Sequence, residues 1–207
     1  REAGADRYLL RFETSADGLY RRLHPGARSG RHSRIELLAV LRRLGYEVGT
    51  GFLVGLPGQS LESLADDLLV LASLEPDMVG IGPFLPHPGT PLGGARAGST
   101  LLALKAVALA RLLCPRANIP STSALGVAGG REALFAGLRW GANVVMPDLT
   151  PAPYRTLYEI YPGKGRGPEP GAFHAELLAG LEALGRLPGA GRGDGYRGVP
   201  AGGKGVA

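Results

Sequence analysis

The chain has 207 residues, 44% of them hydrophobic, which is enough for one domain with its own core. No run approaches the ~18 apolar residues of a membrane helix, and no signal-peptide pattern opens the chain. The formal charge is +5, but four basic residues and one aspartate lie from Arg186 onward, so the excess is uneven. This placement indicates a solvated basic tail and argues against a nucleic-acid-binding surface.

In chain order, short apolar runs alternate with longer amphipathic ones. The expected elements are a strand over 8–12, a helix over 34–44, a strand over 48–54, a helix from Ser60, a strand over 78–84, a helix over 100–114, a strand over 118–124, a helix over 131–140, a strand over 143–146 and a helix over 172–184. In the first of these helices, Ile35, Leu38 and Leu41 lie along one side.

Strands and helices that alternate in this way predict a parallel sheet, because each crossover returns the chain to the same edge. A complete βα barrel has eight units in about 250 residues, so the five expected here predict a partial TIM-type barrel without its first three. An open, doubly wound sheet is the alternative fold. We expect residues 1–164 to form the partial barrel, 165–185 a loop and terminal helix, and 186–207 a flexible tail rich in Gly and Arg.

Cysteine and histidine usage limits the metal chemistry of the chain. Cys114 is the single cysteine, and one thiol cannot form an internal disulfide or hold an iron–sulfur cluster. It ends the apolar run Leu-Leu-Cys, which is typical of a buried small hydrophobe. The four histidines have no metal-ligand spacing, so no metal site is predicted within the chain. A cytoplasmic location is expected.

The carboxyl ends of the predicted strands would carry the reactive groups of a βα barrel. They offer glycines, prolines, small hydroxyls and carboxylates, with no Gly-x-Ser-x-Gly nucleophile turn and no phosphate-binding loop. Glycines allow a bulky ligand to approach the backbone closely. This composition favours a cofactor that brings its own reactivity and is placed by the protein.

Three charged residues, two at the first predicted strand and one at the start of the following helix, each have two interpretations. Arg11 and Glu13 are two apart, so on a strand they point to the same side. They either form an internal ion pair or bind a ligand, the carboxylate taking an ammonium or ribose and the arginine a carboxylate. Arg34 stands in the first turn of a helix, where a cation is slightly misplaced, so it is either a surface residue or faces a ligand carboxylate.

Several motifs, taken together and in order, resemble a known family. They are YLLRFETS over 8–15, VGLPGQ over 54–59, DMVGIGPF over 77–84, PHPGTPL over 86–92, GGRE over 129–132 and GANVVMP over 141–147. From about residue 6 to residue 164 the chain resembles the HydE family of [FeFe]-hydrogenase maturases, which are radical S-adenosylmethionine (SAM) enzymes.

The resemblance implies a βα barrel whose [4Fe-4S] cluster is held by a Cys-x-x-x-Cys-x-x-Cys loop in an amino-terminal part that this chain does not include. The cluster reduces SAM to a 5′-deoxyadenosyl radical. In this family the radical chemistry helps to build the di-iron subcluster of the hydrogenase, from an iron–cysteine complex delivered by a partner maturase. Other hydrogenase maturases are therefore the implied partners, with no role for nucleic acid or membrane, and the chain alone is expected to be inactive.

Carried over by motif position, the resemblance implies that Glu13 contacts the amino group or ribose of SAM and that Arg34 contacts its carboxylate. The residues implied to line the cavity for the second substrate are Arg11, Thr122, Ser123, Met146 and Tyr161. Ser123 stands where the family more usually has a second threonine, so a hydroxyl is kept and a methyl is missing. Two alternatives stay open: a biotin-synthase-like or methylornithine-synthase-like enzyme, and a non-catalytic half-barrel scaffold.

Overall fold

The computed structural model describes residues 1–26, 31–155, 157–165, 167 and 169–195. The strands within these ranges are β1 (Arg7–Leu9), β2 (Glu47–Val54), β3 (Met78–Pro83), β4 (Pro120–Ser121) and β5 (Val144–Val145). The helices are α1 (Asp17–Leu23), α2 (Arg31–Arg43), α3 (Leu61–Leu74), α4 (Thr100–Leu113), α5 (Ser123–Arg139), α6 (Ala152–Arg155) and α7 (Pro170–Ala183). No helix in this part of the chain is both long and apolar enough to cross a membrane.

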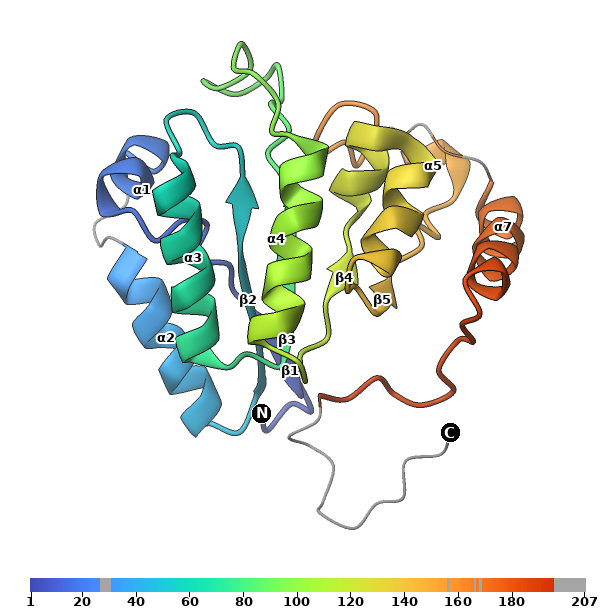
Figure 1. Ribbon diagram of the computed structural model, residues 1–207, viewed down its shortest axis with the longest axis horizontal. Coiled ribbons are helices and arrows are strands. Elements are labelled where there is room, and N and C mark those ends of the chain that lie inside the picture. The colour runs from blue at the N-terminus through green and yellow to red at the C-terminus, as the bar shows by residue number, and fades with distance from the viewer. Residues whose placement is uncertain (27–30, 156, 166, 168, 196–207) are drawn as a thin grey trace.

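All five strands run parallel, and neighbours in space are neighbours in sequence. β2 pairs with β1 and with β3, and β4 pairs with β5. A parallel bridge between Met78 and Asn118 joins the two sheets at β3 and β4. Helices α3 and α4 lie in front of β2 and β3 in Figure 1, so they cover one face of the strands. A doubly wound sheet reverses its strand order and carries helices on both faces, so this arrangement matches an arc of a βα barrel.

The two faces of the strands differ in composition because side chains alternate along a strand. On the helix side, Phe52, Val79 and Ile81 are fully buried among the leucines of α3 and the small residues of α4. The opposite face, called the interior face here, carries Gly49, Gly51, Gly80 and Gly82. At Gly51 the backbones approach so closely that an added Cβ would lie 2.0 Å from the Gly80 carbonyl oxygen. Glycine at this position therefore follows from the strand packing.

The expected strand over 8–12 is shorter in the structure, since β1 ends at Leu9, and the largest boundary differences lie around β4 and α5. The expected strand over 118–124 is reduced to β4, because Thr122 adopts the N-cap position and Ser123 already begins α5. Hydroxyl residues fit a strand or a helix start equally well, which explains the error. The expected helix from residue 131 is the second half of α5, beyond a kink at Gly129 and Gly130. Helix α1 is an element that the sequence patterns did not predict.

Residues 186–195 return from α7 beneath the amino ends of the strands (Figure 1). Arg192 pairs with Asp6 at 2.6 Å, Asn118 Nδ2 donates to the Gly193 carbonyl at 3.1 Å, and Gly195 N–H donates to Glu47 Oε1 at 3.0 Å. These contacts place the first part of the expected tail on the barrel. The rest of that segment, 196–207, lies outside the described residues, and its flexibility stays a prediction.

Cys114 directly follows α4 and is buried against the core on the helix side of the strands. Its expected role as a small buried hydrophobe is confirmed. Burial also raises the pKa of the thiol, although nearby Arg111 opposes this. A buried, protonated thiol is a poor nucleophile and a poor metal ligand.

The close approach at Gly51 yields a stability prediction. Replacing Gly51 with alanine should lower the free energy of unfolding by about 1–3 kcal/mol, because the methyl group would force β2 and β3 apart. Gly18→Ala is the matched control, since nothing lies within 4 Å of its added Cβ and it sits in helix α1. That change should be neutral or slightly stabilising. Denaturant unfolding of both variants checks this, and equal stabilities would contradict the packing argument.

Candidate active site

The candidate site lies at the carboxyl ends of β1 and β2, where Glu13 continues the pairing beyond β1. Glu13 N–H donates to the Gly51 carbonyl at 3.2 Å, and its own carbonyl accepts from Leu53 N–H at 3.1 Å. Its φ is 70°, a left-handed conformation that is strained for a residue other than glycine. Strained residues cluster at functional sites, where the surrounding structure holds them in place.

Arg34, in the first turn of α2, reaches this strand end. Its Nη1 donates to the Arg11 carbonyl at 2.7 Å and lies 3.4 Å from Glu13 Oε1. The guanidinium also stacks over the ring of buried Tyr20, 5.5 Å from its centroid. Helix α1, which supplies Tyr20, therefore helps to orient Arg34. The Glu13 and Arg34 side chains are 22% and 28% exposed, so both charges are accessible to a ligand.

Arg11 lies on the interior face and points across it. A Cβ added at Gly80 would lie 3.2 Å from both its Nε and its Nη2, so the guanidinium lies directly over this glycine. Among the described residues its guanidinium makes no ion pair or hydrogen bond. The internal Arg11–Glu13 pair considered from the sequence was therefore wrong, because Glu13 pairs with Arg34 instead.

Of the residues predicted to line the second-substrate cavity, Ser123 and Tyr161 are in contact with each other. Ser123 Oγ and the Tyr161 hydroxyl are hydrogen-bonded to each other. Thr122 is 4% exposed, and its Oγ1 has no hydrogen-bond partner within the described ranges. That oxygen points at Gly82, where an added Cβ would lie 2.9 Å away. Met146 follows β5 and is exposed.

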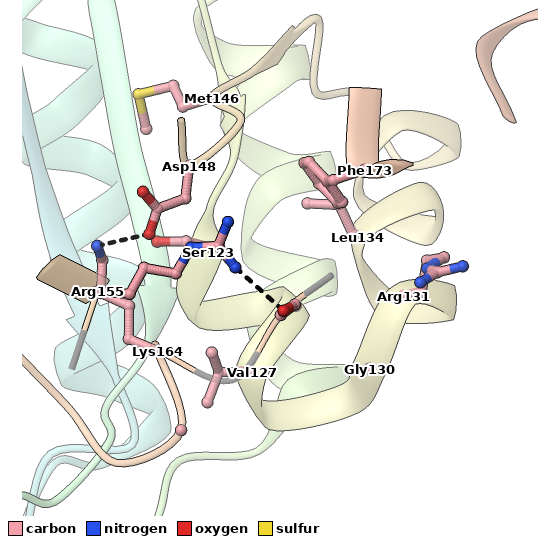
Figure 2. Close-up of a pocket in the computed structure, with 13 residues that line it drawn as sticks. Ser123, Val127, Gly130, Arg131, Leu134, Met146, Asp148, Arg155, Lys164 and Phe173 are labelled. Atoms are coloured by element: carbon pink, nitrogen blue, oxygen red, sulfur yellow. Dashed lines mark hydrogen bonds and ion pairs between the residues drawn. The ribbon is translucent and has the colours of Figure 1, made fainter. Parts of the chain in front are cut away.

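A cavity of about 300 Å³ opens beside these residues, between α5, the segment after β5 and the start of α7 (Figure 2). Its lining includes Ser123, Val127, Leu134, Met146, Asp148 and Lys164. Glu13, Arg34 and Arg11 do not line it. These three face the open side of the strands, which an arc of five strands cannot enclose. The cavity is therefore separate from the strand-end site formed by Glu13, Arg34 and Arg11.

Asp148 and Lys164 are cavity residues to which the sequence patterns assign no role. Lys164 Nζ lies 3.3 Å from Asp148 Oδ2 and 4.1 Å from the centroid of the Tyr158 ring (Figure 2 shows the ion pair). Hydrogen bonds from Thr150 lower the pKa of Asp148, and Lys164 lowers it further. The available signal for Asp148 was a carboxylate directly after the last expected strand.

The described residues do not provide ligands for an iron–sulfur cluster. No group of three or more His, Cys, Asp or Glu is arranged to hold a metal within these ranges. Cys114 is buried on the helix side of the strands, away from the interior face. The Glu13–Arg34 pair, in contrast, offers opposite charges side by side, which suits the zwitterionic amino-acid end of SAM.

A comparison with a solved structure identifies the fold class. The chain superposes on the crystal structure of methylornithine synthase with a TM-score of 0.72 and 29% sequence identity, over 91% of this chain and 54% of that one. Together with the parallel strands in sequential order, this confirms the expected fold class. The chain forms part of a βα barrel of the radical SAM type.

Sequence comparisons then narrow the class. The chain is 55% identical over 166 residues to the [FeFe] hydrogenase maturase subunit HydE of Thermotoga maritima, which is 79% of this chain and 46% of that protein. It is 36% identical to the 3-methylornithine synthase of Methanosarcina barkeri over 73% of this chain and 41% of that protein. It is 34% identical to the biotin synthase of Rippkaea orientalis over 70% of this chain and 38% of that protein. No protein-family model matches.

These comparisons confirm the resemblance to HydE that the motifs indicate. The chain spans about half the length of the curated relatives it matches, 46% in the case of HydE. The activity of a whole barrel is therefore a proposal for this chain.

The environment of Asp148 leads to a pH-dependent prediction. Thr150→Val should raise the pKa of Asp148 towards its ordinary value of 3.8, because it removes the Thr150 hydroxyl, whose hydrogen bond is the largest single cause of the lowered pKa. A lowered carboxyl pKa contributes stability that is present above 3.8 and is lost as pH falls through the folded value. The stability difference between the wild type and Thr150→Val should thus be full at pH 7 and disappear in acid. NMR titration of Asp148 measures the shift, and an unchanged pKa in Thr150→Val would contradict the role of the hydroxyl.

Proposed function

We propose that this chain is the SAM-binding, carboxy-terminal half of an enzyme that matures [FeFe]-hydrogenase by radical SAM chemistry. The observation that carries the proposal is the Glu13–Arg34 pair at the strand ends of a chain that is 55% identical to HydE over 79% of its length. The sequence resemblance supports the kind of enzyme, and the geometry of the pair supports the role of these two residues.

The head group of SAM carries an ammonium and a carboxylate on the same carbon. Glu13 would accept from the ammonium and Arg34 would donate to the carboxylate. Their present contact of 3.4 Å is longer than the ~2.7–2.9 Å of a strong charge-assisted hydrogen bond, so each can exchange its partner for the ligand at little cost.

When bound beside a reduced [4Fe-4S] cluster, SAM supplies one-electron radical chemistry. The described residues offer no ligand set for that cluster. We therefore assign the cluster to an amino-terminal half of the barrel, and the chain alone would bind SAM weakly and leave it intact.

The second substrate would lie across the interior face, towards β4 and β5. Among the described residues, the Arg11 guanidinium makes no ion pair and could take a carboxylate, and the buried Thr122 hydroxyl has no hydrogen-bond partner. Ser123, Tyr161 and Met146 would complete the wall. These groups suit a small iron–cysteine complex, delivered by other hydrogenase maturases in the cytoplasm.

A methylornithine-synthase-like or biotin-synthase-like enzyme would use the same SAM site with another substrate. Its support is lower identity, 36% and 34%, over similar lengths. A non-catalytic half-barrel would need neither a ligand-accessible Glu13 nor an Arg11 that pairs with no described residue. Substrate assays on the complete barrel separate these cases, since only the maturase supports activation of apo-hydrogenase together with the other maturases.

Replacing Glu13 with glutamine tests the SAM site. In the complete, cluster-loaded barrel, Glu13→Gln should weaken SAM binding at least about tenfold, because a hydrogen bond to a charged group is worth about 1.5–3 kcal/mol. Glu36→Gln is the matched control, since Glu36 is an exposed residue of α2. Equilibrium binding and 5′-deoxyadenosine formation are the measurements.

The control variant should bind and cleave SAM as the wild type does. If the cluster-loaded wild type forms no 5′-deoxyadenosine, the proposed function fails. If the wild type is active and Glu13→Gln equals it, the proposed role of Glu13 fails alone.

A further inference from the structure

Helix α3 buries a carboxylate that the proposed chemistry does not use. Asp67 is fully buried, between the core residues Leu64 and Leu71 on the same side of the helix. It makes no ion pair with a basic residue in the described part of the chain. Burial of an unpaired carboxylate is costly, and it raises the pKa of Asp67 despite the hydrogen bonds that the group accepts.

The two oxygens of Asp67 join two strand-end loops. Oδ1 accepts from the backbone N–H of Ser15, two residues after Glu13. Oδ2 accepts from Gln59 Nε2 at 3.0 Å. A single side chain of α3 therefore links the loop after β1 to the loop after β2.

Gln59 is itself fixed by the loop that follows β2. Its Oε1 accepts from Gly55 N–H at 2.7 Å and from Leu56 N–H at 3.3 Å. Its Nε2 also donates to the Leu53 carbonyl at 3.0 Å. The amide cannot flip without breaking these bonds, so it must present a donor to position 67.

Position 67 consequently faces the donors Ser15 N–H and Gln59 Nε2, one at each carboxylate oxygen, and the Ser15 hydroxyl adds a further hydrogen bond. Only a side chain with two acceptor oxygens satisfies both. Asparagine would turn its own NH2 towards one of them in either orientation, and an apolar residue would leave both unpaired. The chemistry of the site therefore specifies aspartate and excludes its nearest isostere.

The link to Glu13 follows from its strained backbone. Residue 13 has a φ of 70°, and β2 holds it through Gly51 and Leu53. Those bonds fix the residue only on the β2 side. The Ser15–Asp67 bond fixes the chain just beyond it, so the left-handed conformation is held from both directions.

We infer that Asp67, oriented by Gln59, is a positioning residue that holds the Glu13 carboxylate in place to bind the amino-acid end of SAM. This inference rests on the proposed function of Glu13. Asp67 touches neither SAM nor the second substrate. Its effect on binding passes through Ser15 and the backbone of residue 13.

The test compares Asp67→Asn with Asp66→Asn in the complete, cluster-loaded barrel. Asp66 is the exposed neighbour on the same helix, so the control makes the same chemical change without breaking the link between the two loops. Asp67→Asn should weaken SAM binding about tenfold, as expected when the hydrogen bond between Glu13 and the SAM ammonium is misaligned. The KM for the second substrate should not change, and Asp66→Asn should match the wild type. Gln59→Met, which keeps the volume and removes the amide, should weaken SAM binding in the same direction.

Binding is measured with SAM well below the melting temperature, alongside thermal unfolding. A lower melting temperature with unchanged SAM affinity, in Asp67→Asn or in Gln59→Met, would show a merely structural role and overturn the inference. If Asp67→Asn does not fold, the Gln59→Met result decides. A wild type that fails to bind SAM would contradict the proposed function, which is a distinct outcome.

Discussion

The site depends on how the backbone of Glu13 is held against β2. Its N–H and carbonyl are hydrogen-bonded to Gly51 and Leu53, which extends the β1–β2 pairing past the end of β1. This places a carboxylate at the mouth of the barrel in a conformation that an isolated glutamate would rarely adopt. Arg34 can reach it only because α1 and α2 follow directly and Tyr20 supports the guanidinium. The remaining groups are arranged around this point.

The contrast between the two faces of the strands explains how a small core and an open site coexist. The helix side concentrates the apolar burial in residues such as Phe52, Leu71 and Ile81, which stabilises the arc. The interior face does not contribute to this apolar burial. It carries glycines, and the Arg11 side chain extends over them. Glycines would destabilise an ordinary sheet, yet here they let Arg11 lie over Gly80 and the Thr122 hydroxyl lie against Gly82. The helix side of the strands thus stabilises the fold, and the interior face carries the candidate site.

Much of the fold could be predicted because β2, α3 and α4 have strong periodicity and clear caps, such as Ser60. Helix α1 was missed because it is only seven residues long, and the start of α5 because serine and threonine serve strands and helix caps alike. Glu13 and Arg34 could be named from motifs, but their mutual contact depends on how α1 and α2 cross β1. Asp67 had a readable signal: it lies three residues after Leu64 and four before Leu71, on the apolar side of α3. A sequence cannot say which donors meet such a carboxylate.

The central proposal is that this chain binds the amino-acid end of SAM through Glu13 and Arg34. A crystal structure of the complete barrel with SAM bound measures this directly. The account predicts the SAM ammonium within hydrogen-bonding distance of the Glu13 carboxylate and the SAM carboxylate against the Arg34 guanidinium, with the Glu13–Arg34 contact opened. SAM bound elsewhere in the barrel, with that contact intact, would contradict it.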